Sequence, residues 1–224
     1  GVVDSLIGNT PGDRFYYGED EQSETHAFMT DGVLTLRFED HRYPLLEMDG
    51  LSLIGRHNIR NALAASLATR LVGVPAESIV DGLHTARPLP HRLELVATHN
   101  GVVWLNDSKA TNVAATRSAL ESLIQPVVLL LGGVDKGEDF RSLIPSVAHL
   151  RAVLAYGAAA PRIVSEIEDA VLVDGDLGLV VQRARKLAEE GDAILLSPAC
   201  SSFDMFDNYE ERGQVFAALA RESL

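Results

Sequence analysis

Three segments of this chain place charged and hydroxyl side chains directly after apolar runs. Asp107 and Lys109 follow residues 102–106, Lys136 follows 126–132, and Ser202 follows 193–198. Lysine ammonium groups and hydroxyls donate hydrogen bonds that a carboxylate or a phosphate accepts. These residue types therefore predict a site for an anionic small molecule.

The elements around these segments predict an α/β fold. Short apolar strands are expected at 102–106, 126–132, 152–157, 170–173 and 193–198, and helices at 112–123, 139–149, 158–167, 176–190 and 208–222. Apolar strands that alternate with helices indicate a parallel sheet covered on both faces. Ligands of such sheets bind outside the carboxyl ends of the strands, so Asp107, Lys109, Lys136 and Ser202 are expected to share one rim.

The first 86 residues have a different pattern, β-rich at first and then helical. Strands are expected at 24–29 and 33–39, and helices at 58–71 and 75–86, with Asn58 as the N-cap of the first helix. Pro88 and Pro90 then interrupt both periodicities. We therefore predict two domains, residues 1–89 and 90–224.

The composition excludes several classes of protein. Lysine plus arginine total 19 against 32 acidic residues, and the net charge of −13 disfavours nucleic acid and anionic membranes as partners. The sequence has no run of about 18 apolar residues, and its first residues lack the pattern of a signal peptide. The single cysteine, Cys200, cannot form an internal disulfide, so we expect a small buried side chain in a protein of the reducing cytoplasm.

Each candidate residue also has a purely structural interpretation. Asp107 and Ser108 could cap the next helix, Gly132 and Gly133 could form a tight turn, and Lys136 could be a surface lysine. The sequence contains no G-x-x-x-x-G-K-[ST] phosphate loop, no G-x-G-x-x-G after a strand, and no CxxC or HExxH metal motif. From the residues alone, the prediction stops at an α/β domain that binds an anionic small molecule.

Five segments resemble successive motifs of the Mur ligase family, in the family's order: GRHNIRNALAA (55–65), LPHRLE (89–94), NDSKATN (106–112), GGVDKGEDF (132–140) and LLSPACSSFDMFDNYEERG (195–213). Members that add other residues carry an aspartate-tyrosine motif near 106–112, so the resemblance is to members that add D-glutamate. It implies that residues 1–89 are the end of a central ATP-binding domain and that 90–224 are a Rossmann-like carboxy-terminal domain. The family's phosphate loop and magnesium ligands would lie upstream.

The resemblance also implies roles for individual residues. Those implied for ATP are Asn58, Asn61, Arg92, Asp107 and Lys109, and those implied for catalysis are Lys109, Arg92 and His91. Those implied for D-glutamate are Thr111, Lys136, Ser202, Phe203 and Tyr209. Tyr209 departs from the phenylalanine that the family has at this position.

The implied reaction joins D-glutamate to UDP-N-acetylmuramoyl-L-alanine in the cytoplasm, during peptidoglycan precursor synthesis. It uses ATP and Mg²⁺ and passes through an acyl phosphate. The enzyme is expected to be a monomer, and this chain alone to be inactive.

Two alternatives remain open. One is a ligase like folylpolyglutamate synthase, which would add an L-amino acid. An assay with D- and L-glutamate separates it from the first hypothesis. The other is a non-catalytic nucleotide-binding module. Three cations near one rim, Arg92, Lys109 and Lys136, argue against it, because a scaffold has no need of them.

Overall fold

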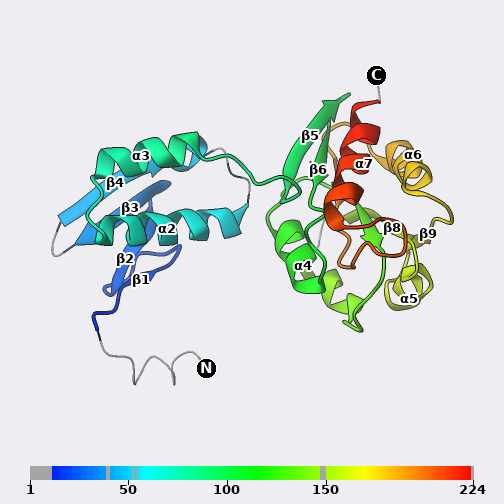
Figure 1. Cartoon of the computed structure of the whole chain (residues 1–224), viewed down its shortest axis with the longest axis horizontal. Coiled ribbons are helices and arrows are strands. Elements are labelled where there is room, and N and C mark those ends of the chain that lie inside the picture. Colours follow the sequence, from blue (N-terminus) through cyan, green and yellow to red (C-terminus); the bar gives the residue numbers. More distant parts are fainter. Residues whose placement is uncertain (1–11, 39–40, 52, 54, 147–149, 223–224) are drawn as a thin grey trace. The chain divides into compact units, whose positions relative to one another are not determined.

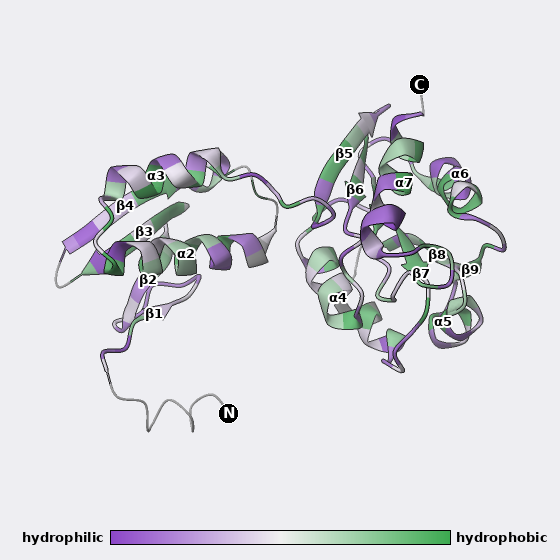
Figure 2. Cartoon of the chain, viewed as in Figure 1, coloured by the Kyte–Doolittle hydropathy of each residue, from purple (hydrophilic) through white to green (hydrophobic). Residues whose placement is uncertain are grey.

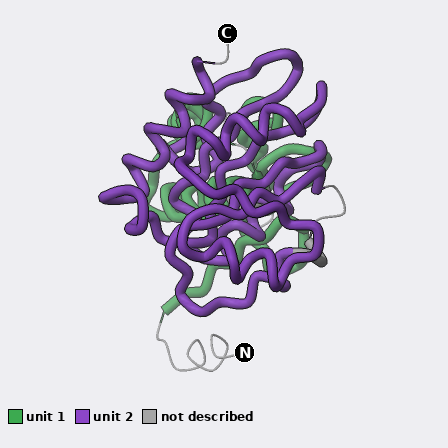
Figure 3. Tube along the Cα trace, turned by 90° about the vertical axis from the view of Figure 1, so that its right-hand side faces the viewer, with its two compact units in different colours: residues 1–87 green, residues 88–224 purple. Residues whose placement is uncertain are grey.

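The computed structural model describes residues 12–38, 41–51, 53, 55–146 and 150–222. The chain divides into two compact units, Gly1–Arg87 and Pro88–Leu224, which Figure 3 shows in different colours. The division lies two residues before the boundary at 89/90 that the sequence suggests. Each unit has its own hydrophobic core and is described separately below.

Among its described residues, unit 1 contains a four-stranded sheet and two α-helices (Figure 1). Its strands β1 (Tyr16–Tyr17), β2 (Thr25–Thr30), β3 (Val33–Phe38) and β4 (His41–Glu47) lie in chain order, and a 3₁₀ helix, η1 (Met48–Gly50), follows. Strands β2 and β3 pair antiparallel as a hairpin, so both strands predicted for this unit are present. Leu34 and Leu36 of β3 pack with Leu63 and Leu67 of the first helix, because residues two apart on a strand point to the same face.

The α-helices described in unit 1 are α2 (Arg56–Leu71) and α3 (Ala76–Thr85). The prediction that Asn58 caps α2 is wrong: the N-cap is Gly55, and Asn58 lies inside the first turn. Gly55 has a φ of 101°, a backbone conformation that only glycine adopts readily. The helix therefore starts two residues earlier than the pattern of alanines and leucines suggests.

Unit 2 contains a six-stranded sheet with the order β5-β6-β10-β7-β8-β9. The strands are β5 (Glu94–His99), β6 (Val102–Asn106), β7 (Val127–Gly132), β8 (Leu150–Tyr156), β9 (Val171–Leu172) and β10 (Ala193–Leu196). All five predicted strands are present and pair parallel with one another. The prediction missed β5, which turns back at Asn100 and Gly101 and pairs antiparallel with β6. The sheet is therefore mixed at this edge.

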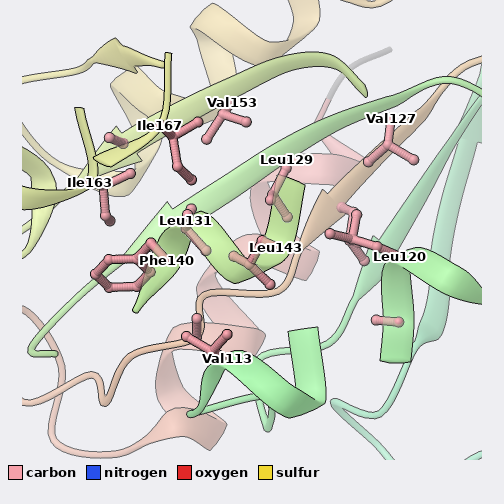
Figure 4. Close-up of a cluster of buried hydrophobic side chains, with 14 of the residues drawn as sticks. Val113, Leu120, Val127, Leu129, Leu131, Phe140, Leu143, Val153, Ile163 and Ile167 are labelled. Atoms are coloured by element: carbon pink, nitrogen blue, oxygen red, sulfur yellow. The ribbon is translucent and has the colours of Figure 1, made fainter. Parts of the chain in front are cut away.

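Helices cover both faces of this sheet, as predicted. Helix α4 (Val113–Glu121), η2 (Phe140–Ser146) and α5 (Ala160–Glu166) contribute to one core cluster, and α6 (Leu177–Leu187) and α7 (Tyr209–Arg221) to the other. Figure 4 shows Leu129 and Leu131 of β7 in the first cluster. Val128 and Leu130 point to the second, so β7 is apolar on both sides. Figure 2 shows the resulting hydrophobic strands β7 and β8.

The segment expected to be a helix at 139–149 differs from the prediction. Phe140–Ser146 forms a 3₁₀ helix, and 147–149 lie outside the described residues. Pro145 has no backbone N–H to donate, which disfavours an α-helix here. No helix within the described residues is long and apolar enough to cross a membrane.

Candidate functional site

Three loops meet where the neighbouring strands β6, β10 and β7 end. The first loop is 107–112, the second is 133–139 and the third is 197–208; together they are called the rim below. The Asp107 N–H donates to the Leu196 carbonyl at 2.8 Å, and the Gly132 N–H donates to the Pro198 carbonyl at 3.0 Å. Val134 and Ser201 form a bridge between the second and third loops. The shared rim that the strand–helix order predicts is therefore present.

The buried side chain of Arg212, in α7, connects loops of the rim. It is fully buried, with none of its surface exposed. Its guanidinium donates to the hydroxyl and carbonyl oxygens of Ser108, both at 2.9 Å, and to the Cys200 carbonyl at 3.2 Å. The second loop passes so close that a Cβ on Gly133 would lie 3.2 Å from Arg212 Nη1. One side chain therefore joins the first and third loops by hydrogen bonds and lies close to the second.

Sequence reasoning missed Arg212, although one signal pointed to it. Arg212, Phe216 and Ala220 recur every four residues in the closing helix and lie on its buried face. An arginine in line with core residues indicates a buried, hydrogen-bonded guanidinium.

Asp107 is the buried first residue of the first loop, and both of its carboxylate oxygens accept hydrogen bonds. Oδ1 accepts from the Leu93 N–H at 3.2 Å, and Oδ2 accepts from the Ser197 hydroxyl at 2.7 Å. Burial raises the pKa of Asp107 to about 6, although these two hydrogen bonds and the charge of Arg92 act in the opposite direction. Asp107 therefore ties the segment after the prolines to the first and third loops.

The raised pKa of Asp107 predicts a pH-dependent stability. Below the ordinary pKa of 3.8 the carboxyl is protonated whether folded or unfolded, and above pH 6 the cost of burying its charge is fully present. The free energy of unfolding, relative to an Asp107→Asn variant, should fall by about 2 kcal/mol as pH rises from 4 to 7. Urea unfolding followed by the fluorescence of Trp104, the single tryptophan, measures this difference.

Asp139→Asn is a matched control for that experiment. Asp139 is exposed, and its hydrogen bond with Arg141 lowers its pKa. Its charge stabilises the folded state, and that stability is lost as pH falls. The wild type should therefore not lose stability relative to this variant as pH rises. If the difference in the free energy of unfolding between the wild type and Asp107→Asn is constant from pH 4 to 7, the prediction is wrong.

Lys109 lies over the start of helix α7. Its Nζ is 3.9 Å from the centre of the Tyr209 ring, a distance typical of a cation–π contact. The neighbouring Ser108 hydroxyl donates to the Tyr209 carbonyl at 2.8 Å. Asn208 caps this helix, because its side chain accepts from the Glu211 N–H. Lys109 and Tyr209, implied for different ligands, are thus in direct contact.

The residues implied for D-glutamate lie on all three loops. Lys136 Nζ is 3.4 Å from Thr111 Oγ1, which joins the second loop to the first. Ser202 is buried and directly follows Ser201, the residue that bridges to Val134. The Phe203 ring is 74% exposed.

The remaining candidates fall into two places. His91 is buried beside the first loop, and its carbonyl accepts from the Lys109 N–H at 3.1 Å. Arg92 is exposed next to it. Asn58 and Asn61 lie in unit 1, one turn apart on α2, with 3.4 Å between Asn61 Nδ2 and Asn58 Oδ1. The structure thus brings the candidates of unit 2 together and pairs the two asparagines with each other.

Cys200 behaves as the small buried side chain that the sequence predicts. It is fully buried behind the rim, and burial raises the pKa of its thiol to about 12. Among the described residues, no group of three histidine, cysteine or acidic side chains could hold a metal ion.

Comparison with known proteins supports one family. Residues 91–200 match the family described as Mur ligase, glutamate ligase domain. The UDP-N-acetylmuramoylalanine–D-glutamate ligase of Acidobacterium capsulatum is 43% identical over 210 residues, which are 92% of this chain and 46% of that protein. The ligase of the same name from Rubrobacter xylanophilus is 46% identical over 202 residues, 88% of this chain and 45% of that protein. The chain thus spans about half the length of these relatives.

Solved structures share the fold. The UDP-N-acetylmuramate-alanine ligase MurC of Thermotoga maritima aligns with a TM-score of 0.65 at 13% identity, covering 93% of this chain and 48% of that one. MurF ligase of the same organism, solved with ADP, aligns at 0.57 and 15% identity, covering 88% and 46%. These structures share the fold, and the sequence matches show that the chain belongs to the Mur ligase family, with residues 91–200 matching its glutamate ligase domain.

Proposed function

We propose that this chain is part of an ATP-dependent ligase that joins D-glutamate to UDP-N-acetylmuramoyl-L-alanine. The observation that carries the proposal is a rim with two lysines in different surroundings: Lys136 next to Thr111, and Lys109 over Tyr209. Neither lysine forms an ion pair with a described residue, so both are available to anionic ligands. The names of the relatives at 43% and 46% identity supply the substrates.

The two lysines divide the ligands between them. D-glutamate has two carboxylates, and a chain of net charge −13 must offer them local counter-charge. Lys136 and Ser202 hold the side-chain carboxylate, and Thr111 orients the amino acid. Lys109, Arg92 and Asp107 serve the nucleotide, and Tyr209 lies between the two groups of residues.

The proposed reaction has two steps. A carboxylate oxygen of the acceptor attacks the terminal phosphorus of ATP, giving an acyl phosphate and ADP. The amine of D-glutamate then attacks the acyl carbon, a C–N bond forms, the C–O bond to phosphate breaks, and the amine loses a proton. The residues of this chain contribute positioning and charge compensation. Mg²⁺ would neutralise phosphate charge in such a ligase, but the described residues offer it no ligand cluster, so no step is assigned to it here.

The test is an assay of the ligase that carries this chain, with the preceding segment that the relatives have. Phosphate release with ATP, UDP-N-acetylmuramoyl-L-alanine and D-glutamate should exceed the release with L-glutamate. Equal or greater use of L-glutamate would favour a ligase like folylpolyglutamate synthase. No amino-acid-dependent release would favour a non-catalytic module. We further propose that the enzyme acts as a cytoplasmic monomer. Light scattering of the purified protein measures its oligomeric state.

We expect the 224-residue chain alone not to hydrolyse ATP. A phosphate loop supplies backbone N–H groups and a lysine for the phosphates, and this sequence contains no such motif. Phosphate release at saturating ATP and Mg²⁺ should equal the background. A Lys109→Ala variant, purified in the same way, identifies a contaminating ATPase, which would be equally active in both samples. Release that the variant loses would contradict the prediction.

A further inference from the structure

His91 has an unusual backbone conformation and an enclosed ring. Its φ is 64°, which is uncommon for a residue with a side chain. Its N–H donates to Glu94 Oε2 at 2.9 Å, and its carbonyl accepts from the Lys109 N–H at 3.1 Å. These two bonds hold the backbone, and the ring then points towards Asn106 and helix α7.

The orientation of the Asn106 amide is determined by its neighbours. Its Oδ1 accepts from the Ser108 N–H at 3.2 Å. Its Nδ2 faces the Gly213 carbonyl at 3.2 Å and Glu94 Oε2 at 3.4 Å, neither of which can donate. Rotating the amide by 180° would set its oxygen against both acceptors and its NH₂ against an N–H. Nδ2 is therefore the atom that faces His91.

This orientation determines where the imidazole proton lies. Asn106 Nδ2 is 2.9 Å from His91 Nδ1, and Nδ2 is only a donor, so Nδ1 must accept with its lone pair. A neutral imidazole with an accepting Nδ1 carries its proton on Nε2. Nε2 makes no hydrogen bond to a described residue, so its N–H is available to a ligand.

Gly213 makes this arrangement sterically possible. A Cβ at position 213 would lie 2.1 Å from His91 Nδ1, closer than any real contact. A side chain there would push the ring away from Asn106.

We propose that Asn106 and Gly213 are positioning residues that fix His91 as its neutral Nε2–H tautomer. His91 is then a hydrogen-bond donor at the rim, and neither a base nor a cation. The assignment of the tautomer depends only on this chain. That the donor serves an oxygen of the nucleotide rests on the function proposed above.

The tautomer is measured directly by two-bond ¹H–¹⁵N correlation spectra of the ¹⁵N-histidine-labelled 224-residue chain at neutral pH. The sequence has seven histidines, and the signals that a His91→Gln variant loses belong to His91. We expect an unprotonated Nδ1 and a protonated Nε2. A protonated Nδ1, an imidazolium or an even mixture of tautomers would overturn the proposal.

Two substitutions of Asn106 test its role. Asn106→Asp replaces the donor by an acceptor and should move the proton to Nδ1. Asn106→Ala removes the donor without adding charge and should give a mixture of tautomers, which covers the case in which the aspartate variant does not fold. Asn112→Asp is the control: it adds the same charge but keeps a residue that can cap α4, and it should leave the His91 spectrum unchanged. Wild-type signals in both folded Asn106 variants would remove Asn106 from the mechanism.

The nucleotide step has its own readout. In the ligase, Asn106→Ala should raise the KM for ATP more than that for D-glutamate. An altered tautomer with an unchanged KM for ATP would show that the donor does not serve the nucleotide. A ligase that is inactive with every amino acid would instead count against the proposed function and leave the tautomer result intact.

Discussion

Replacing Lys136 by alanine in the ligase is expected to raise the KM for D-glutamate by about 10–150-fold and to leave the KM for ATP nearly unchanged. Lys136 lies 3.4 Å from Thr111 and makes no ion pair with a described residue, so its charge is free for a ligand. A charge-assisted hydrogen bond contributes roughly 1.5–3 kcal/mol, and this energy sets the expected range. Steady-state kinetics with each substrate varied in turn measures both constants.

The chain provides two matched comparisons, because it has only three lysines. Lys109→Ala should act mainly on the use of ATP and on turnover. Lys186→Ala, in helix α6 on a face of the sheet, should change neither constant. If Lys136→Ala leaves the KM for D-glutamate unchanged, Lys136 is not part of the site. If Lys109→Ala and Lys136→Ala raise the same constant equally, the proposed division of the two ligands is wrong.

Replacing Arg212 by alanine is expected to lower the free energy of unfolding of unit 2 by about 3–5 kcal/mol. The substitution leaves a large cavity and removes the donors to the Ser108 hydroxyl and to two buried carbonyls. Denaturant unfolding followed by the fluorescence of Trp104 reports on this unit, because the single tryptophan lies in β6 and is 2% exposed.

Arg141→Ala is the control for Arg212→Ala. The Arg141 side chain is 69% exposed and pairs with Asp139 on the surface, so its loss should change stability little. Arg212→Lys should be intermediate, because one ammonium cannot reach oxygen atoms of two loops in the way that a planar guanidinium does. If the unfolding midpoint of Arg212→Ala is as close to the wild-type midpoint as that of Arg141→Ala, then Arg212 does not hold the rim together.

The sequence was sufficient for the outline of unit 2. All five apolar runs form strands, and the residues that follow β6, β7 and β10 meet at one rim. This success has a physical reason. Strands buried on both faces must be continuously apolar, and parallel strands end at the same side of a sheet. The motifs from 55 to 213 also indicated the family that the comparisons show.

Local sequence patterns predicted the structure less well where more than one residue could begin an element. Asparagine is a good N-cap, yet the N-cap of α2 is Gly55, three residues before Asn58, and its φ of 101° brings the chain into the helix at Arg56. The segment Glu94–His99 has charged or polar ends and an apolar run of only three residues, 95–97, so it was not predicted to be a strand. The segment forms strand β5 because the turn at Asn100 and Gly101 brings β6 back alongside it, and the two strands pair antiparallel.

By itself, the sequence determined the type and order of the elements in unit 2, the loops that carry the cations, and the family. These depend on periodicity and on motifs that lie within a few residues of each other. The tertiary structure alone placed β10 between β6 and β7, and this insertion brings the loop with Ser202 beside the loops that carry Lys136 and Asp107. It also decided that Arg212 bonds to Ser108, 104 residues away, and that Asn106 meets His91 against Gly213. Contacts between residues so far apart are fixed only when both cores pack, so no local pattern could specify them.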